Sequence, residues 1–279
     1  MKIINSSFEI IPQGYGKQDI FKHIELCGRV SYKSEDKITD DSANEFVGRR
    51  IVDGHTAILE QGTVYLEIPN KNENTEFYIN SAAVLKYMDN PYSVVTLTEK
   101  GCYVTTNYRV LFENKWLNDI DYLCAPTDKH EKRVTVKFVT SRGITHELVR
   151  HRVFSFVQES TRYCNYSQGK FGQELTFIKP SMYDTWNEET QGLYRATLKG
   201  IETSYMTMVN SSIKPQQARG ILPNDLKAEI YMTGFVSQWV EFFKLRTAFN
   251  AHPDMRELVS PLKRKFEELY PEAFKDTNI

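Results

Sequence analysis

The sequence has few cysteines, no long apolar run and almost no net charge, and each absence excludes a class of protein. The four cysteines form neither a CxxC pair nor a zinc-like cluster, so we expect reduced thiols and no metal site. No window approaches about 18 consecutive apolar residues, and the first residues lack a signal peptide's apolar run, so we expect a cytoplasmic protein without a membrane anchor. With 35 basic and 36 acidic side chains, the net charge of -1 argues against binding to long nucleic acid.

The composition is close to the average of globular proteins. Its 279 residues include 41% hydrophobic and 25% charged side chains, enough to bury a core without disulfides or metal. We therefore expect a single domain over residues 1–279.

The first half mixes helical and strand patterns. Apolar residues recur with a helical period over residues 17–29 and 42–52. Residues 63–68 and 134–140 alternate in polarity and are rich in β-branched side chains, so we predict strands that could pair in one antiparallel sheet. Between them, around residues 70–133, we expect an elaborated insertion that contains a helix near residues 82–88 and a turn at Asp89, Asn90 and Pro91.

The second half is mainly helical by pattern. Helical composition over residues 144–152 is followed by an extended stretch at residues 171–180. Asn187 precedes an acidic turn and is expected to cap a helix. Further helices are predicted over residues 193–210, 215–220, 224–246 and 255–270.

The segment from His146 to Tyr163 concentrates the chemistry, because it holds three arginines and two histidines in eighteen residues. On a helix, residues four apart share a face, which would place Glu147 near His151. Arg150 and Arg152 would point in different directions and could serve two anions, since planar guanidinium groups suit phosphate oxygens and heterocycle edges.

Three other interpretations of this segment are weighed against a ligand site. By composition alone, a solvated or ion-paired basic surface is the commoner case. A zinc motif needs a second histidine four residues after His146, but that position is Arg150. A nucleic-acid-binding site is disfavoured by the neutral overall charge and by the absence of a helix-turn-helix, RRM or zinc-finger pattern.

The order of residues then indicates a family. Arg150-His151-Arg152, followed after seven residues by Ser160, resembles the RHR(x)7S signature of the flavin-dependent thymidylate synthases. Further landmarks that resemble the family occur in order along the chain, excluding the insertion: Arg29-Val30-Ser31, Gly54-His55, Glu60, Thr161-Arg162-Tyr163, Arg219 with Leu222-Pro223, and Leu245-Arg246.

The resemblance implies a fold and a reaction. The implied fold is α/β (α+β), with an antiparallel sheet flanked by helices as in the thymidylate synthase-complementing proteins, in a homotetramer whose active sites are shared between chains. The implied reaction is reductive methylation of dUMP to dTMP, with methylenetetrahydrofolate and NADPH as co-substrates and FAD as hydride carrier. A flavin supplies the redox chemistry, so the protein's share is binding, alignment and electrostatics.

The resemblance also implies site residues, in two overlapping sets. Arg246 is the implied catalytic residue, because a fixed guanidinium stabilises negative charge that develops on the uracil ring. Positions implied to surround FAD are Ser31, His55, Arg150, His151, Arg152, Gln158 and Glu241. Positions implied to surround dUMP are Glu147, Arg150, Gln158, Ser160, Thr161, Arg162, Arg219 and Arg246.

Some positions depart from the family pattern. Glu147 stands where a glutamine is common, Gln158 where an acidic residue is common, and Glu241 follows Ser237 in a run that replaces flavin-contacting asparagines. His252 stands in for a histidine near the folate. These differences leave open an enzyme that makes a 5-hydroxymethyl pyrimidine nucleotide, and, from another class, a non-catalytic nucleotide- or RNA-binding homologue.

Overall fold

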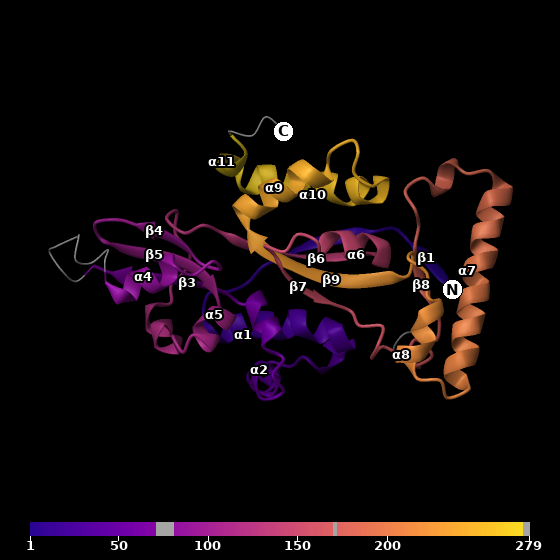
Figure 1. The fold of residues 1–279 in the computed structure, drawn as a ribbon, viewed down its shortest axis with the longest axis horizontal. Coiled ribbons are helices and arrows are strands. Elements are labelled where there is room, and N and C mark those ends of the chain that lie inside the picture. The colour runs from indigo at the N-terminus through magenta and orange to yellow at the C-terminus, as the bar shows by residue number, and fades with distance from the viewer. Residues whose placement is uncertain (71–80, 170–171, 276–279) are drawn as a thin grey trace.

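The computed structural model describes residues 1–70, 81–169 and 172–275. Helices pack on both faces of a central antiparallel sheet, with smaller sheets at its two ends (Figure 1). The strands are β1 (Lys2–Ile4), β2 (Ser7–Ile11), β3 (Thr63–Pro69), β4 (Val94–Leu97), β5 (Gly101–Asn107), β6 (Arg133–Ser141), β7 (Ser155–Gln158), β8 (Thr176–Ile178) and β9 (Lys227–Phe235). The α-helices are α1 (Lys17–Arg29), α2 (Ser42–Val52), α4 (Ala82–Met88), α5 (Tyr108–Glu113), α6 (Arg142–Leu148), α7 (Glu188–Asn210), α8 (Pro215–Ala218), α9 (Val236–Arg246), α10 (Pro253–Leu269) and α11 (Pro271–Phe274). The prediction of antiparallel sheet flanked by helices is confirmed.

The central sheet has the order β2-β6-β9-β7. Its strand β9 corrects the sequence prediction, which gave residues 224–246 to one helix. Ala228, Ile230 and Met232 are helix-compatible in composition, but they alternate with residues that face the other side of the sheet. Pairing with β6 on one side and β7 on the other stabilises the strand, and long-range pairing of this kind overrides local propensity. The predicted helix therefore begins only at Val236, as α9.

Each face of the central sheet carries its own layer of helices. In Figure 1, α9 and α10 lie above the sheet and α1 and α2 below it. The upper layer buries a cluster of aromatic side chains that includes Trp239, Phe242, Phe243 and Phe266 against β6 and β9. Burial of this many large side chains fixes the position of α9, and so of the residues at its C-terminal end.

A second sheet with the order β3-β5-β4 lies at one end of the molecule, beside α4 and α5 (Figure 1). The predicted pairing of residues 63–68 with residues 134–140 is wrong, because β3 pairs with β5, in register from Thr63 opposite Asn107 to Pro69 opposite Gly101. Alternation predicts a strand but does not identify its partner. Residues 71–80 lie outside the described structure, and the predicted helix at residues 82–88 is confirmed as α4.

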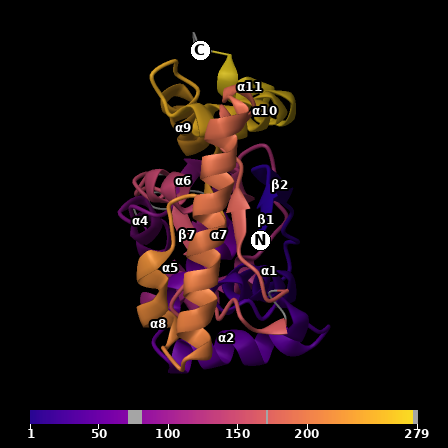
Figure 2. The ribbon, with the colours of Figure 1, turned by 90° about the vertical axis from the view of Figure 1, so that its right-hand side faces the viewer.

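The longest helix, α7, covers the opposite end of the molecule. Figures 1 and 2 both show it beside the parallel pair β1 and β8. Its predicted cap is confirmed, because the Asn187 side chain accepts a hydrogen bond from the Thr190 backbone N–H at 2.8 Å. Leu198 and Tyr205 of α7 pack against Phe177 of β8 in a separate small core. No helix within the described ranges is both long enough and apolar enough to span a membrane.

Candidate active site

The arginine-rich segment forms a turn between α6 and β7, which corrects the prediction of a helix over residues 144–152. α6 ends at Leu148, and the chain then reverses through turns in which the Arg152 N–H binds the Arg150 carbonyl and the Phe154 N–H binds the His151 carbonyl. The reversal lets β7 pair with β9, while Phe154 is buried against Trp239 at 4.8 Å between ring centroids. A turn presents Arg150, His151 and Arg152 in three directions from one short stretch.

Arg246, at the end of α9, is held by this turn and by α6. Its Nε donates to Nε2 of His151 at 2.8 Å, one terminal nitrogen donates to the Glu147 carboxylate at 2.7 Å, and the other donates to the Glu147 carbonyl at 3.0 Å. The side chain is only 16% exposed. Three acceptors on two elements thus fix one guanidinium. The expected proximity of Glu147 and His151 is realised around Arg246.

His151 is neutral in this arrangement. Burial, together with the positive charges of Arg246 and Arg150, lowers the pKa of His151 to about 4. Its ring packs edge-to-face on Phe242 at 4.9 Å. Because Nε2 accepts the hydrogen bond from Arg246, the ring proton of the neutral form is assigned to Nδ1.

Both arginines of the signature are exposed in the single chain. Arg150 and Arg152 are exposed, and within residues 1–70, 81–169 and 172–275 neither forms an ion pair with a carboxylate. The same holds for Arg219, which follows α8 directly. Such uncompensated cations are available to an anionic ligand, and Arg152 faces a cavity.

The signature serine lies beside an early landmark of the sequence. The Ser160 N–H donates to the Ser31 carbonyl at 3.3 Å, and the Ser160 hydroxyl accepts from the Arg162 N–H at 3.3 Å. Thr161 is buried. Gln158 donates to the Thr145 hydroxyl of α6 at 2.8 Å. The end of β7 is therefore tied to both α6 and the N-terminal segment.

Arg162 contacts α8, the short helix that Arg219 follows in the chain. The Arg162 Nε donates to the side chain of Gln216 at 3.3 Å, and Gln216 lies on the short helix that Arg219 follows. The structure thus collects Glu147, Arg246 and His151 at one place, and Ser31, Ser160 and Arg162 at the next part of the same edge, along β7.

Three predicted residues make contacts with groups other than Arg246. His55 follows Gly54, whose φ of +72° suits glycine, and its Nδ1 lies 3.4 Å from the Tyr32 hydroxyl. Glu241 is exposed, pairs with Lys244 at 2.6 Å, and lines a different cavity that Ser237 also lines. His252 caps α10 by accepting from the Asp254 N–H at 3.2 Å.

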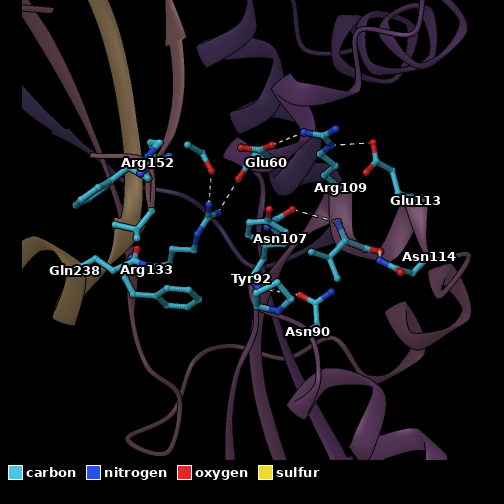
Figure 3. A pocket seen from close by; sticks show the side chains of 16 residues that line it. Glu60, Asn90, Tyr92, Asn107, Arg109, Glu113, Asn114, Arg133, Arg152 and Gln238 are labelled. Carbon is cyan, nitrogen blue, oxygen red and sulfur yellow. Dashed lines mark hydrogen bonds and ion pairs between the residues drawn. The ribbon is translucent and has the colours of Figure 1, made fainter. Parts of the chain in front are cut away.

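A cavity of about 600 Å³ opens between the central sheet and the β3-β5-β4 sheet (Figure 3). Arg152 and Gln238 line it on one side, while Asn107 and Arg109 line it on the other. Arg133, at the start of β6, extends between them. Sequence reasoning missed Arg109 and Arg133; the only available signal was a cation at the start of a predicted strand, which does not indicate a cavity.

Comparison with known proteins identifies the family of the chain. The family model described as thymidylate synthase complementing protein matches residues 84–272. The chain belongs to this family. The family predicted from the signature is therefore confirmed, and with it the prediction of an enzyme.

Relatives in the thymidylate synthase complementing protein family are distant. The flavin-dependent thymidylate synthase of Geobacter sulfurreducens is 25% identical over 205 residues, which cover 70% of this chain and 85% of that protein. The enzyme of the same name from Mycolicibacterium gilvum is 28% identical over 147 residues, 50% of this chain and 59% of that protein. Among solved structures, a UMP/dUMP methylase from Streptomyces cacaoi bound with 5-Br dUMP shares 15% identity, covers 98% of this chain and 96% of its own, and superposes with a TM-score of 0.46.

Proposed function

We propose that this protein methylates dUMP to dTMP, with methylenetetrahydrofolate as carbon donor, NADPH as reductant and FAD as the hydride carrier. The observation that carries the proposal is the fixed guanidinium of Arg246, held by Glu147 and His151 beside the signature turn. Membership of the family supports the class of reaction.

Arg246 is the proposed catalytic residue. Hydride delivery to the uracil ring, or polarisation before it, places negative charge on the ring, and a guanidinium already held in position stabilises that charge without reorganisation. Arginine keeps its charge at neutral pH, so it acts electrostatically and does not transfer a proton. His151, the Glu147 carbonyl and the Glu147 carboxylate accept from three of the five N–H groups of the guanidinium, which leaves two N–H groups for the substrate.

The nucleotide is proposed to lie along the end of β7. Exposed Arg150, Arg162 and Arg219 supply cations for the phosphate, while Ser160 supplies a hydroxyl and Thr161 a backbone N–H. Gln158 and Glu147 are proposed to face the uracil edge, because amide and carboxylate groups pair with the N–H and carbonyl groups of such rings.

The residues of the turn fit a flavin dinucleotide. Arg150 and Arg152 are exposed cations without a carboxylate partner in the described ranges, and a diphosphate needs two such groups. Ser31, His55, His151 and Gln158 are proposed to complete the FAD environment, and Glu241 belongs to it only if another chain brings it there. FAD supplies two-electron redox chemistry when it is bound.

An assembly of several chains, proposed here as a homotetramer, would enclose these exposed groups. Large apolar side chains that neighbour Arg246 and the turn in sequence are exposed in the single chain: Val153 is 63% exposed, Leu245 63% and Phe249 91%. Apolar side chains gathered beside a cluster of ligand-binding residues favour coverage by another subunit. We propose a cytoplasmic location, in keeping with a metabolic reaction on soluble substrates.

The test uses purified protein. The absorption spectrum should show bound flavin, and NADPH should be oxidised in a manner that depends on dUMP. The nucleotide product, measured by mass, should be dTMP; a product heavier by one oxygen would indicate the 5-hydroxymethyl alternative. Colourless protein that does not oxidise NADPH even with added FAD would support the non-catalytic alternative and refute the proposal.

A further inference from the structure

The cavity between the central sheet and the β3-β5-β4 sheet has a lining of which the proposed chemistry uses only Arg152. Its volume, about 600 Å³, lies in the range of small-molecule sites. One wall comes from the turn and α9, and the other from residues between Asn90 and Asn114 (Figure 3). The second wall belongs to the segment that the sequence predicts as an insertion.

Arg133 is the unusual member of this lining. Its terminal nitrogens donate to the Glu60 carbonyl at 2.7 Å and to the Ser155 hydroxyl at 2.9 Å, and its guanidinium carbon lies 5.9 Å from the centre of the Phe235 ring. All of these partners are neutral. In the described part of the chain, no carboxylate lies within ion-pair distance of Arg133. A largely desolvated cation without a counter-ion is costly, so an arginine held in this way favours an anionic ligand.

The carboxylates nearby are already engaged. Glu60 and Glu113 line the same cavity, and both pair with Arg109, at 2.5 and 2.8 Å. Burial lowers the pKa of Arg133 to about 10, although the Glu60 carboxylate acts in the opposite direction. Glu60 and Glu113 both pair with Arg109, so in the described ranges neither is an ion-pair partner of Arg133. With three arginines and two glutamates, the lining of the cavity carries a net charge of +1.

The remaining lining suits a flat ring next to the anion. Phe154 and Phe235 are buried beside the cavity, and Tyr92 is 63% exposed at its outer wall. Amide groups of Asn90 and Asn114 offer donors and acceptors. Aromatic faces together with amides and a cation are the usual surroundings of a heterocyclic ligand that carries a carboxylate or a phosphate.

We propose that this cavity binds the anionic group, carboxylate or phosphate, of a co-substrate other than the pyrimidine nucleotide, with Arg133 as its principal cationic contact. The naming of that co-substrate rests on the proposed function: NADPH supplies a phosphate, and methylenetetrahydrofolate supplies carboxylates. The segment between Asn90 and Asn114 then serves as the outer wall of a ligand site.

The experiment measures ligand affinities by calorimetry on the flavin-loaded protein. NADPH, methylenetetrahydrofolate and dUMP are titrated separately into the native protein, Arg133→Met and Arg133→Lys. The dissociation constant of one co-substrate should rise about 10- to 100-fold in Arg133→Met, as expected for loss of a charged hydrogen bond, and less in Arg133→Lys, with dUMP affinity unchanged. Arg264→Met, an exposed arginine of α10 outside the cavity, serves as the matched control and should bind all ligands normally.

A second variant covers the case in which Arg133→Met does not fold. Tyr92→Ala removes an exposed ring from the outer wall and should weaken the same co-substrate several-fold. Affinities within twofold of native for both co-substrates, in every folded variant, overturn the proposal. A change confined to FAD retention also overturns it, because Arg133 would then belong to the flavin site. If co-substrate binding depends on Arg133 but the native protein forms no dTMP, the ligand site in the cavity is supported and the proposed function is refuted. If the native protein forms dTMP but the Arg133 variants bind both co-substrates with native affinity, the proposed function is supported and the ligand site is refuted.

Discussion

Replacement of Arg246 is the most direct test of the assigned chemistry. In Arg246→Ala, the Glu147 carboxylate, the Glu147 carbonyl and His151 Nε2 each lose a donor. Because the pair is partly exposed, at 16% for Arg246 and 27% for Glu147, we expect the free energy of unfolding to fall by only about 1–2 kcal/mol. The barrier to turnover should rise more, by roughly 3–4 kcal/mol, which is a loss of about 10²- to 10³-fold in kcat, as for removal of one donor to a developing anion.

Arg246→Lys separates charge from position. An ammonium group keeps the positive charge, but it cannot reach His151 and the two Glu147 oxygens together. We therefore expect a smaller loss of stability than in Arg246→Ala, yet a fall in kcat of at least about tenfold. Lys244→Ala is the control, because Lys244 is another cation in the last turn of α9. Its unfolding free energy should change by no more than about 0.5 kcal/mol, and its turnover should stay native.

The assays are dTMP formation under saturating substrates, flavin absorbance to confirm cofactor retention, and urea unfolding. Turnover of Arg246→Ala within threefold of native, with flavin bound, would refute the assigned role. Equal losses in Arg246→Ala and Lys244→Ala would show that the charge at the end of the helix matters and its position does not.

Two further predictions concern the protonation of His151 and the packing of glycines. Since the pKa of His151 in the folded protein, about 4, lies below its ordinary value, the unfolded chain binds the proton first, and stability should fall as the pH drops from about 6.5 towards 4. After a discount for solvent exposure we expect about 1–2 kcal/mol, measured as a smaller loss of unfolding free energy in His151→Gln over the same pH range. Gly234→Ala would place a Cβ 2.4 Å from the Phe154 ring and should cost about 2 kcal/mol in urea unfolding, whereas Gly200→Ala on α7 meets nothing within 4 Å and should stabilise by up to about 1 kcal/mol.

Local signals in the sequence predicted local structure well. The helices over residues 17–29 and 42–52 have the predicted bounds, and Asn187 caps α7, because apolar period and capping depend on neighbours within one or two turns. Partners of strands depend on distant residues. The pairing of β3 with β5 and the conversion of residues 227–235 into a central strand follow from contacts that no local window contains.

In the candidate site, too, some residues could be predicted from the sequence and others depend on contacts between distant parts of the chain. The family resemblance identified Glu147, His151 and Arg246 before the structure brought them together, whereas the helical composition of residues 144–152 gave the wrong local conformation for residues 149–152. Arg133 could not be found, because its importance depends on what surrounds it. Its neighbours Glu60 and Ser155 come from different parts of the chain, and the absence of a counter-ion in the described ranges is a property of the fold.

Arg246 and Arg133 are suited to different roles because their hydrogen-bond partners differ in charge. Arg246 already has a carboxylate partner in Glu147, so a permanent anion gains little by binding there, whereas charge that appears only in the transition state still meets a donor in the correct place. Binding that is weak in the ground state and stronger in the transition state raises kcat. Arg133 has only neutral partners, so a permanent carboxylate or phosphate gains the full interaction in the ground state, which lowers Kd without acting on the reacting ring. Loss of Arg246 should therefore appear mainly in kcat and loss of Arg133 mainly in KM for one co-substrate, and the opposite pattern would reverse the two assignments.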